Sequence, residues 1–358
     1  MKRLLSICFA LFLFAQVSWA EEPHKYSALI EESRDAVVLV ATESESGQGG
    51  FGSGFLITDD GIVVTNYHVI HRNTNILIWF YDEDDPRHYP ATVLAIDPVS
   101  DIALLQIEVK PRLLPLEFLD IEGDKEEIRV GDAIISIGHF LGLDWTVTRG
   151  YISHINRPNR ISPYISLIQH DAAINRGNSG GPVINTEGNV VGVNTYAFLS
   201  KNEHMGAAYA LRGDILDEIV EELIEKGEVV RPGLGLKLLQ LNEFSRARLI
   251  KEHVGQTFPN TFGLLAVEVV LDSWAYKQGL RTFDSIIAVN GIPVNGLDDL
   301  TDEVKDLSVG DVINLIIIRD SVFMELTYEL KVLEFDYMKF YDDRVAKQKR
   351  GSGNDGIR

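Results

Sequence analysis

The chain has 358 residues, of which 45% are hydrophobic and 24% are charged, and its formal net charge at pH 7 is −20. This composition is that of a globular protein with room for two domains, so we do not expect disorder to dominate. The negative charge repels polyanions, so neither nucleic acid nor an anionic membrane surface is expected as a partner.

Residues 1–20 have the pattern of a secretory signal peptide. Lys2 and Arg3 give a positive start, and a largely apolar run follows from Leu4 to Val17. The alternative is a retained membrane anchor, but this run is shorter than the roughly 20 residues of a spanning helix. We therefore expect cleavage, a periplasmic location and no stable membrane span. The one cysteine, Cys8, lies in this segment, and export without disulfides is compatible with a periplasm.

Residues 21–229 are predicted to form the first domain, in which short apolar runs alternate with turn residues. The runs at 55–58 and 62–65 flank Asp59-Asp60-Gly61, which predicts a β-hairpin. The glycine- and serine-rich stretch from Thr42 to Gly50 is interpreted as a short flexible link. Further strands are predicted at residues 76–81, 91–96, 102–107, 133–137, 146–153, 165–169 and 190–194. So many short strands favour a sandwich or a barrel.

The pattern becomes helical at residues 215–225, and Gly227 ends the predicted helix. Residues 230–335 are predicted to form a second module. Its predicted elements are strands at 285–291 and 312–318 and a helix at 298–307. Residues 336–358 are polar and are expected to be a disordered tail.

Three short motifs of the first domain point to chemistry. His68 closes a β-branched run, Asp101 stands at the mouth of an apolar strand, and Ser179 lies among glycines. Glycine permits the positive φ and the close approach that a nucleophile loop needs. A plain turn explains the serine loop equally well when it is taken alone. The order His, Asp, Ser is, however, that of the chymotrypsin-type triad.

Together these motifs resemble the HtrA (Deg) family of serine proteases, which show GSGF, TNxHV, a DxAL-like motif and GNSGGP in that order. Here the four motifs stand at residues 52–55, 65–69, 101–104 and 177–182. The resemblance extends to about residue 335 and implies a mainly β fold. It predicts a double six-stranded, chymotrypsin-like β-barrel as the protease domain, followed by an α+β PDZ domain.

The resemblance also implies a role for each site residue. Ser179 is the expected nucleophile, His68 the general base and later the acid, and Asp101 the residue that orients the imidazole. The backbone N–H groups of Gly177 and Ser179 are expected to form the oxyanion hole, with Asn178 shaping the turn. Such a mechanism requires neither a cofactor nor a metal.

Other histidines are interpreted as structural. His71 lies three residues from His68, but no metal-binding cluster accompanies it, so we interpret it as a surface residue. His170 replaces the threonine that is usual in the family and is interpreted as structural, with tuning of the pH response as the alternative. His139 and Phe140 depart from the family's usual Asn-Pro-Phe stretch, which leaves the conformation of their loop open.

The substrate pocket is expected to be apolar. Ala173 and Ile174 occupy the region that sets the pocket floor in chymotrypsin-type enzymes, and no acid stands there. Ala207 is a candidate for the second wall. We therefore expect cleavage after small or medium apolar residues such as valine or alanine. Unfolded chains expose such residues and folded chains hide them, which fits unfolded or misfolded proteins as substrates.

The PDZ module is expected to bind peptide C-termini. Leu234, Gly235 and Leu236 match the carboxylate-binding loop of the family, whose consecutive N–H groups receive a terminal carboxylate. Leu300 and Val304 are expected to line the pocket for the last side chain. The alternative is that these two residues fill the core of the module.

Three further positions in this module depart from the family pattern. Trp274, Gln278 and Phe283 stand where proline, alanine and glycine are usual. The resemblance also implies a homotrimer, for which Tyr26, Leu29 and Ile30 are candidates, although they equally suit a cap on their own barrel.

Three functions remain open from the sequence. The first is an exported endopeptidase that degrades misfolded proteins. The second is a sensor protease that makes one regulatory cut when its PDZ domain is occupied. The third is a chaperone-like binder with a resting inactive site, which the intact triad disfavours.

Overall fold

The computed structural model describes residues 22–80, 88–108, 114–119, 128–140, 143–158, 165–200, 203–242, 245–247, 249, 262–269, 271, 273–304 and 306–333. The predicted signal peptide and the polar tail therefore lie outside the described residues. No helix within the described ranges is long and apolar enough to cross a membrane. The chain divides into two compact units.

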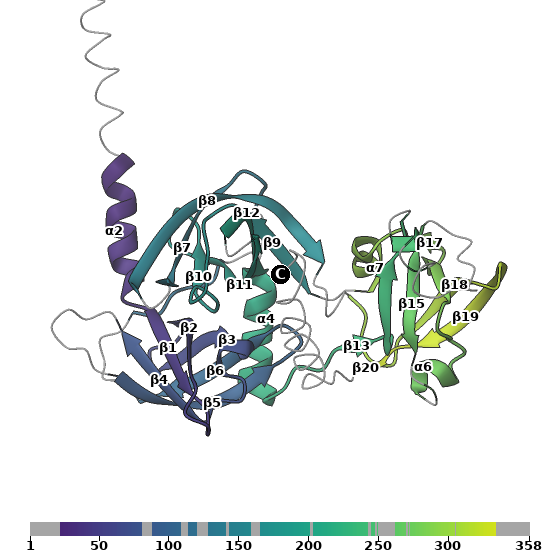
Figure 1. The fold of residues 1–358 in the computed structure, drawn as a ribbon, viewed down its shortest axis with the longest axis horizontal. Helices are drawn as coiled ribbons and strands as arrows, with labels where there is room; N and C mark the ends of the chain where they lie inside the picture. Colours follow the sequence, from purple (N-terminus) through teal and green to yellow (C-terminus); the bar gives the residue numbers. More distant parts are fainter. Residues whose placement is uncertain are drawn as a thin grey trace, which may run out of the picture. The chain divides into compact units, whose positions relative to one another are not determined.

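Two closed six-stranded barrels follow helix α2 (Glu22–Arg34), as Figure 1 shows. The first barrel has the order β1-β2-β3-β6-β5-β4 and the second β10-β11-β12-β9-β8-β7. The strands of the first are β1 (Val37–Glu43), β2 (Gly49–Leu56), β3 (Ile62–Asn66), β4 (Asn75–Phe80), β5 (His88–Asp97) and β6 (Ile102–Ile107). Those of the second are β7 (Ala133–Phe140), β8 (Leu143–Pro158), β9 (Ser166–His170), β10 (Pro182–Ile184), β11 (Val190–Ser200) and β12 (Glu203–Arg212). The predicted double barrel is confirmed.

The core of the first barrel depends on β3 and β6. All five residues of β3 are buried, and so are all residues of β6 except Gln106. Such continuous apolar runs are typical of strands covered on both faces. The two strands are antiparallel and pair Asn66 with Ile102. The end of β3 and the start of β6 therefore lie side by side.

The interpretation of residues 42–50 as a flexible link is wrong. β1 and β2 continue into this stretch and pair Thr42 with Gly50 and Glu43 with Gly49. The N–H of Ser44 donates to the carbonyl of Gln48 at 3.0 Å, which closes a tight hairpin. The small polar residues of this stretch conceal the cross-strand pairing, because they lack the alternating apolar side chains of a half-buried strand.

Helix α2 contacts the second barrel through two side chains. The guanidinium of Arg149 lies 4.1 Å from the ring centroid of Tyr26. Leu29 packs so closely on Gly188 that an added Cβ there would lie 2.8 Å from its Cδ1. These contacts correspond to the alternative of a cap on the same barrel, and the homotrimer stays a prediction.

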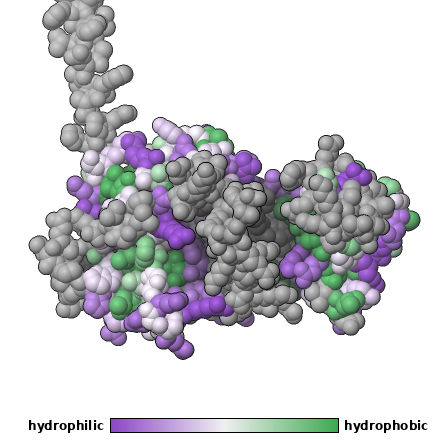
Figure 2. Space-filling model, in the orientation of Figure 1, coloured by the Kyte–Doolittle hydropathy of each residue, from purple (hydrophilic) through white to green (hydrophobic). Residues whose placement is uncertain are grey.

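Apolar residues also reach the surface of the first barrel. Figure 2 shows green apolar patches on the face in view, interrupted by purple and white areas. Val93 and Leu94 on β5 are 48% and 46% exposed, and Phe51 on β2 is 44% exposed. Exposed apolar residues that are scattered in this way are normal for a folded protein.

The C-terminal module has a main sheet of order β14-β15-β16-β18-β19, with β17 paired to β16, and a separate β13–β20 pair. Its strands are β13 (Pro232–Gly233), β14 (Leu236–Gln240), β15 (Leu264–Val269), β16 (Ser285–Val289), β17 (Ile292–Pro293), β18 (Val312–Arg319), β19 (Val322–Glu329) and β20 (Lys331–Val332). Its helices are α6 (Trp274–Lys277) and α7 (Leu297–Val304), and α4 (Gly213–Lys226) precedes it. The predicted helix at 298–307 is too long, since Leu307 lies in a turn whose N–H donates to Val304.

Two of the three unusual residues of this module have local partners, and the third keeps a glycine-like backbone conformation. The carboxamide of Gln278 pairs with the main chain of Glu329, donating to its carbonyl at 2.9 Å and accepting from its N–H at 2.7 Å. Trp274 packs on Tyr328 with ring centroids 5.4 Å apart. Phe283 has a φ of 75°, a left-handed conformation that costs a non-glycine residue roughly 1–2 kcal/mol.

A buried ion pair braces the same sheet. Asp284 is fully buried, and its carboxylate accepts two hydrogen bonds from the guanidinium of Arg319, each at 2.7 Å. The N–H of Arg281 donates to the same carboxylate at 2.7 Å. The hydrogen bond that Arg319 donates to Asp284 raises the pKa of Arg319. Arg319 also donates to the carbonyl of Gly279 at 2.6 Å, so the pair belongs to a small hydrogen-bonded network.

We expect Arg319→Ala to lower the free energy of unfolding of this module by about 3–5 kcal/mol, because it leaves the Asp284 carboxylate buried and unpaired. Lys237→Ala is the matched control, since the Lys237–Glu268 pair at 2.6 Å is exposed and such pairs contribute about 1 kcal/mol or less. Urea unfolding of the full chain, followed by intrinsic fluorescence, measures both. Equal losses in the two variants would contradict the expectation.

Candidate active site

His68 and Asp101 meet because of the pairing of β3 with β6. Asn66 is the last residue of β3, and the short helix α3 (Tyr67–Ile70) follows it and carries His68. Asp101 immediately precedes β6. Since Asn66 pairs with Ile102, the residues beyond these two ends are brought to the same edge of the barrel.

The Asp101 carboxylate holds His68 with both of its oxygens. One accepts from the imidazole Nδ1 at 2.6 Å and the other from the backbone N–H of His68 at 2.8 Å. The carbonyl of Asp101 accepts from the N–H of Tyr67 and the side-chain amide of Asn66, each at 2.9 Å. A carboxylate oxygen only accepts, so Nδ1 carries the proton. The lone pair of Nε2 is therefore available as a base.

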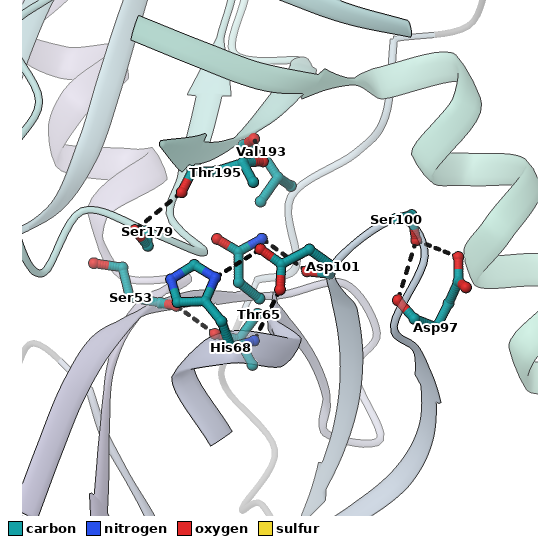
Figure 3. Close-up of polar contacts among 10 residues, drawn as sticks. Ser53, Thr65, His68, Asp97, Ser100, Asp101, Ser179, Val193 and Thr195 are labelled. Atoms are coloured by element: carbon teal, nitrogen blue, oxygen red, sulfur yellow. Dashed lines mark hydrogen bonds and ion pairs between the residues drawn. The ribbon is translucent and has the colours of Figure 1, made fainter. Parts of the chain in front are cut away.

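A tight turn at residues 97–100 precedes Asp101 in the chain. The carboxylate of Asp97 accepts the N–H of Val99 at 3.2 Å and the hydroxyl of Ser100. Figure 3 shows the two hydrogen bonds from Ser100 to Asp97. Asp101 itself has a φ of 63°, a conformation that aspartate adopts more readily than most residues.

The Ser179 loop presents two unpaired backbone donors. Gly177 has a φ of 105°, and Asn178 is 1% exposed with its N–H donating to Asn175 at 3.1 Å. Within the described part of the chain, the N–H groups of Gly177 and Ser179 have no protein acceptor. Two free donors on either side of one residue make an arrangement that can receive a negatively charged oxygen.

The hydroxyl of Ser179 does not bond to His68 in this structure. It donates to the carbonyl of Thr195 on β11 at 3.3 Å instead. In Figure 3, Ser179 lies on the side of the imidazole of His68 that faces away from Asp101. A rotation of the serine side chain is needed to bring the hydroxyl to Nε2, and hydrogen bonds of this kind often tighten only with substrate bound. No motif in the sequence marks Thr195.

The other histidines lie in different surroundings. His170 is fully buried, with Nε2 3.2 Å from the side-chain oxygen of Asn194. His71 is half-buried and its Nδ1 lies 3.0 Å from the hydroxyl of Tyr67. His139 at the end of β7 is 1% exposed and packs edge-on against Trp145, with ring centroids 4.3 Å apart.

The residues predicted for the substrate pocket differ in exposure. Ala173 is exposed and Ala207 is half-buried, so both are accessible. Ile174 is only 3% exposed. No acidic side chain stands at positions 172–175. The exposure of Ala173 and Ala207 leaves them open to contact with a bound chain, whereas Ile174 contributes from below the surface.

The predicted peptide-binding residues of the C-terminal module also divide. Gly235 has a φ of 63° and lies against the indole of Trp274, 2.7 Å from where a Cβ would stand. Leu236 begins β14, which is an edge strand of the described sheet. Leu300 and Val304 are fully buried in a core cluster that includes Leu234. The burial of Leu300 and Val304 agrees with the alternative in which they fill the core of the module.

Two family models match the chain. A trypsin-like peptidase domain matches residues 52–193, and a PDZ domain matches residues 232–332. Two curated relatives, from Bartonella henselae and Pseudomonas putida, are both named as probable periplasmic serine endoproteases, DegP-like. The first is 36% identical over 74% of this chain and 50% of the relative, and the second 33% over 86% and 61%. The chain thus spans about half the length of the curated relatives that it matches.

Solved structures are similar over almost their full length. The HtrA-type protease AlgW with a decapeptide is 26% identical with a TM-score of 0.66, covering 87% of this chain and 99% of that chain. The serine endoprotease from Yersinia pestis is 26% identical with a TM-score of 0.62, covering 86% and 98%. The likeness therefore includes both the barrels and the PDZ domain.

We expect the stability of the chain to fall in acid partly through His139. Burial lowers its pKa from 6.5 to about 4, and neither ring nitrogen has a hydrogen-bond partner among the described residues. Between these two pH values the unfolded chain binds a proton that the folded chain does not. The contribution of neutral His139 is therefore fully present above about pH 6.5 and is lost progressively toward pH 4.

The measurement compares the wild type with His139→Phe, which keeps a ring against Trp145 and does not titrate. Between about pH 7 and pH 4.5 the wild type should lose roughly 2–3 kcal/mol more of its free energy of unfolding than the variant. Above about pH 7 the two curves should run parallel. Parallel curves throughout the acid range would show that His139 titrates normally in the folded chain.

Proposed function

Because the chain belongs to the HtrA/DegP-like family of serine proteases, with a trypsin-like domain and one PDZ domain, we propose that it is a periplasmic endopeptidase that degrades unfolded or misfolded proteins. The observation that carries the proposal is the 2.6 Å hydrogen bond between His68 and Asp101. It supplies an oriented base beside the loop that holds Ser179. The location is inferred from relatives that are named periplasmic.

The proposed reaction begins at Ser179. Its hydroxyl leaves the carbonyl of Thr195 and turns to Nε2 of His68, which takes the proton as the oxygen attacks the peptide carbonyl. Asp101 keeps Nδ1 as the protonated nitrogen and stabilises the imidazolium that forms. The imidazolium then gives its proton to the leaving amine. Water enters, and the same base activates it to release the acyl chain.

The tetrahedral oxyanion is stabilised by the N–H groups of Gly177 and Ser179. Both have no protein acceptor in the described residues, so they are available when the charge develops. A donor that is already oriented stabilises the transition state without reorganisation, and loss of one such donor in a serine protease costs on the order of 10²–10³ in rate. Asn178 holds the turn between the two donors.

The proposed specificity is for small or medium apolar residues before the cleaved bond. A basic residue would find no partner, because positions 172–175 hold no acid. An apolar side chain near Ala173 and Ala207 would instead gain roughly 25 cal/mol for each Å² of apolar surface that leaves water. Unfolded chains offer such side chains, so this pocket favours substrates that have lost their fold.

The PDZ domain is proposed to bind the C-terminus of a peptide as an added strand. β14 is an edge strand among the strands that the structure describes, and the loop before it, at residues 234–236, would give its N–H groups to the terminal carboxylate. Solved relatives include a protease with a tripeptide and one with a decapeptide. The proposed homotrimer rests on the family resemblance alone, and light scattering at micromolar concentration measures it.

Ser179→Ala is expected to abolish cleavage of casein and leave the fold unchanged, because only a hydroxyl is lost and the backbone loop is kept. Ser46→Ala is the matched control, since Ser46 is an exposed serine of the β1–β2 hairpin, and it should digest casein at the wild-type rate. Phenylmethylsulfonyl fluoride should inactivate the wild type and the control. Undiminished, inhibitor-resistant cleavage by the Ser179→Ala variant would overturn the proposal.

The peptides released in that digest report the specificity. Mass spectrometry should find most cuts after valine, alanine and similar residues. A majority of cuts after lysine or arginine would refute the apolar pocket while leaving the nucleophile unaffected.

Peptides with a free apolar C-terminus should bind the full-length Ser179→Ala chain, and amidation should weaken them greatly because charge-assisted hydrogen bonds are lost. Gly235→Ala should weaken the free acid as well, since its Cβ would stand 2.7 Å from the indole of Trp274. Fluorescence anisotropy of labelled peptides measures both. Equal affinity of amide and acid would exclude a carboxylate role for this loop.

A further inference from the structure

Ser53 on β2 joins the first barrel to both sides of the nucleophile. It is fully buried. Its hydroxyl donates to the carbonyl of Gly177 at 2.7 Å, and its backbone N–H donates to the carbonyl of Ser179 at 2.8 Å. The two residues whose N–H groups form the proposed oxyanion hole are thus both bonded to one residue of the other barrel.

The same hydroxyl is also an acceptor. The backbone N–H of His139, at the end of β7, donates to Ser53 Oγ at 2.8 Å. The backbone carbonyl of Ser53 is held too, because it accepts from the hydroxyl of Thr65 at 2.7 Å. Figure 3 shows Ser53 next to His68 and Thr65. The Ser53 hydroxyl therefore donates one hydrogen bond to Gly177 and accepts one from β7.

Gly177 needs such a restraint. Its φ of 105° and the carbonyl of His139, 2.2 Å from where a Cβ would stand, require glycine at this position. Glycine populates many backbone conformations, so its own sterics do not fix the direction of its peptide groups. A hydrogen bond to the Gly177 carbonyl fixes one of these groups. The Gly177 N–H belongs to the preceding peptide group, and the φ and ψ of Gly177 relate it to this fixed plane.

We propose that Ser53 is a positioning residue for the acyl-transfer step: through its hydroxyl it orients the Gly177 N–H toward the developing oxyanion. This inference rests on the proposed function, since it concerns the same reaction. Ser53 touches neither the substrate nor the reacting atoms in this role. Its effect is therefore confined to the transition state, in which the oxyanion exists, and not to ground-state binding of the peptide.

Loss of the hydroxyl has two local consequences. In Ser53→Ala the Gly177 carbonyl and the His139 N–H both lose a buried partner, and a buried group without a partner seeks another. Among the described residues, the hydrogen bond that then remains on the Gly177–Asn178 peptide is the one from the Asn178 N–H to Asn175 at 3.1 Å. A displaced oxyanion donor lowers kcat and leaves KM near its original value, whereas general unfolding lowers the amount of active protein and alters neither constant.

The experiment measures kcat and KM on a quenched peptide copied from the casein fragment that the wild type cuts fastest. Ser53→Ala should lower kcat about 10- to 100-fold with KM within about twofold, and should slow sulfonylation by phenylmethylsulfonyl fluoride in parallel. Thr301→Val is the matched control. It removes another buried hydroxyl that donates to a main-chain carbonyl at 2.8 Å, far along the chain in α7, and should leave kcat unchanged.

A second variant acts on the hydroxyl without removing it. The Cβ of Gly138→Ala would lie 2.8 Å from Ser53 Oγ, so it should displace the hydroxyl and lower kcat in the same direction. This variant decides the matter if Ser53→Ala does not fold. An unchanged kcat in a folded variant would overturn the proposal, and so would failure of both variants to fold, which would make Ser53 a residue of stability alone.

Failure of the proposed function has a different signature. If the wild type and Ser179→Ala cleave casein equally, the proposed serine-protease activity through Ser179 is wrong, whatever Ser53 does. If Ser179→Ala is inactive while Ser53→Ala retains the wild-type kcat, only the positioning role is lost.

Discussion

The antiparallel pairing of β3 with β6 is the constraint on which the candidate site depends. It sets Asn66 opposite Ile102, and both His68 and Asp101 follow from that register. Because side chains alternate between faces, a slip of one residue would reverse every side chain of the strand. Both faces of the two strands are buried, so such a slip is costly because each side chain would have to fit the packing of the opposite face. Packing, rather than any attraction between imidazole and carboxylate, thus determines their meeting.

The second half of the site comes from the other barrel, and its geometry is set mainly by backbone groups. In the proposed mechanism the Ser179 loop contributes backbone N–H donors. Dipoles of fixed direction stabilise a transient oxyanion without adding a permanent charge to the site. Ser53 of the first barrel donates hydrogen bonds to the carbonyls of Gly177 and Ser179, so the two barrels are joined at the Ser179 loop.

Much of this arrangement follows from sequence patterns, because apolar runs and turn residues are local signals. Many of the strands, the helix that ends before Gly227 and the order of the motifs were accessible in this way, whereas the choice of a double barrel over a sandwich came from the family resemblance. Residues whose role depends on distant partners were not. The direction of the Ser179 hydroxyl depends on the carbonyl of Thr195, and the burial of Leu300 depends on strands far along the chain. The β1–β2 hairpin was missed because its glycines and serines carry no apolar alternation.

The pairing of Gln278 with the main chain of Glu329 has a consequence for mutational robustness. Two strands share their hydrogen bonds among many residues, and most side-chain substitutions leave those bonds in place. Here a side-chain amide performs the task of a neighbouring strand. One side chain therefore controls both bonds, and the sensitivity of this segment to substitution is concentrated at Gln278. Substitution at Glu329 keeps the backbone atoms of this pairing and loses only the ion pair of its carboxylate with Lys331, whereas substitution at Gln278 removes both bonds.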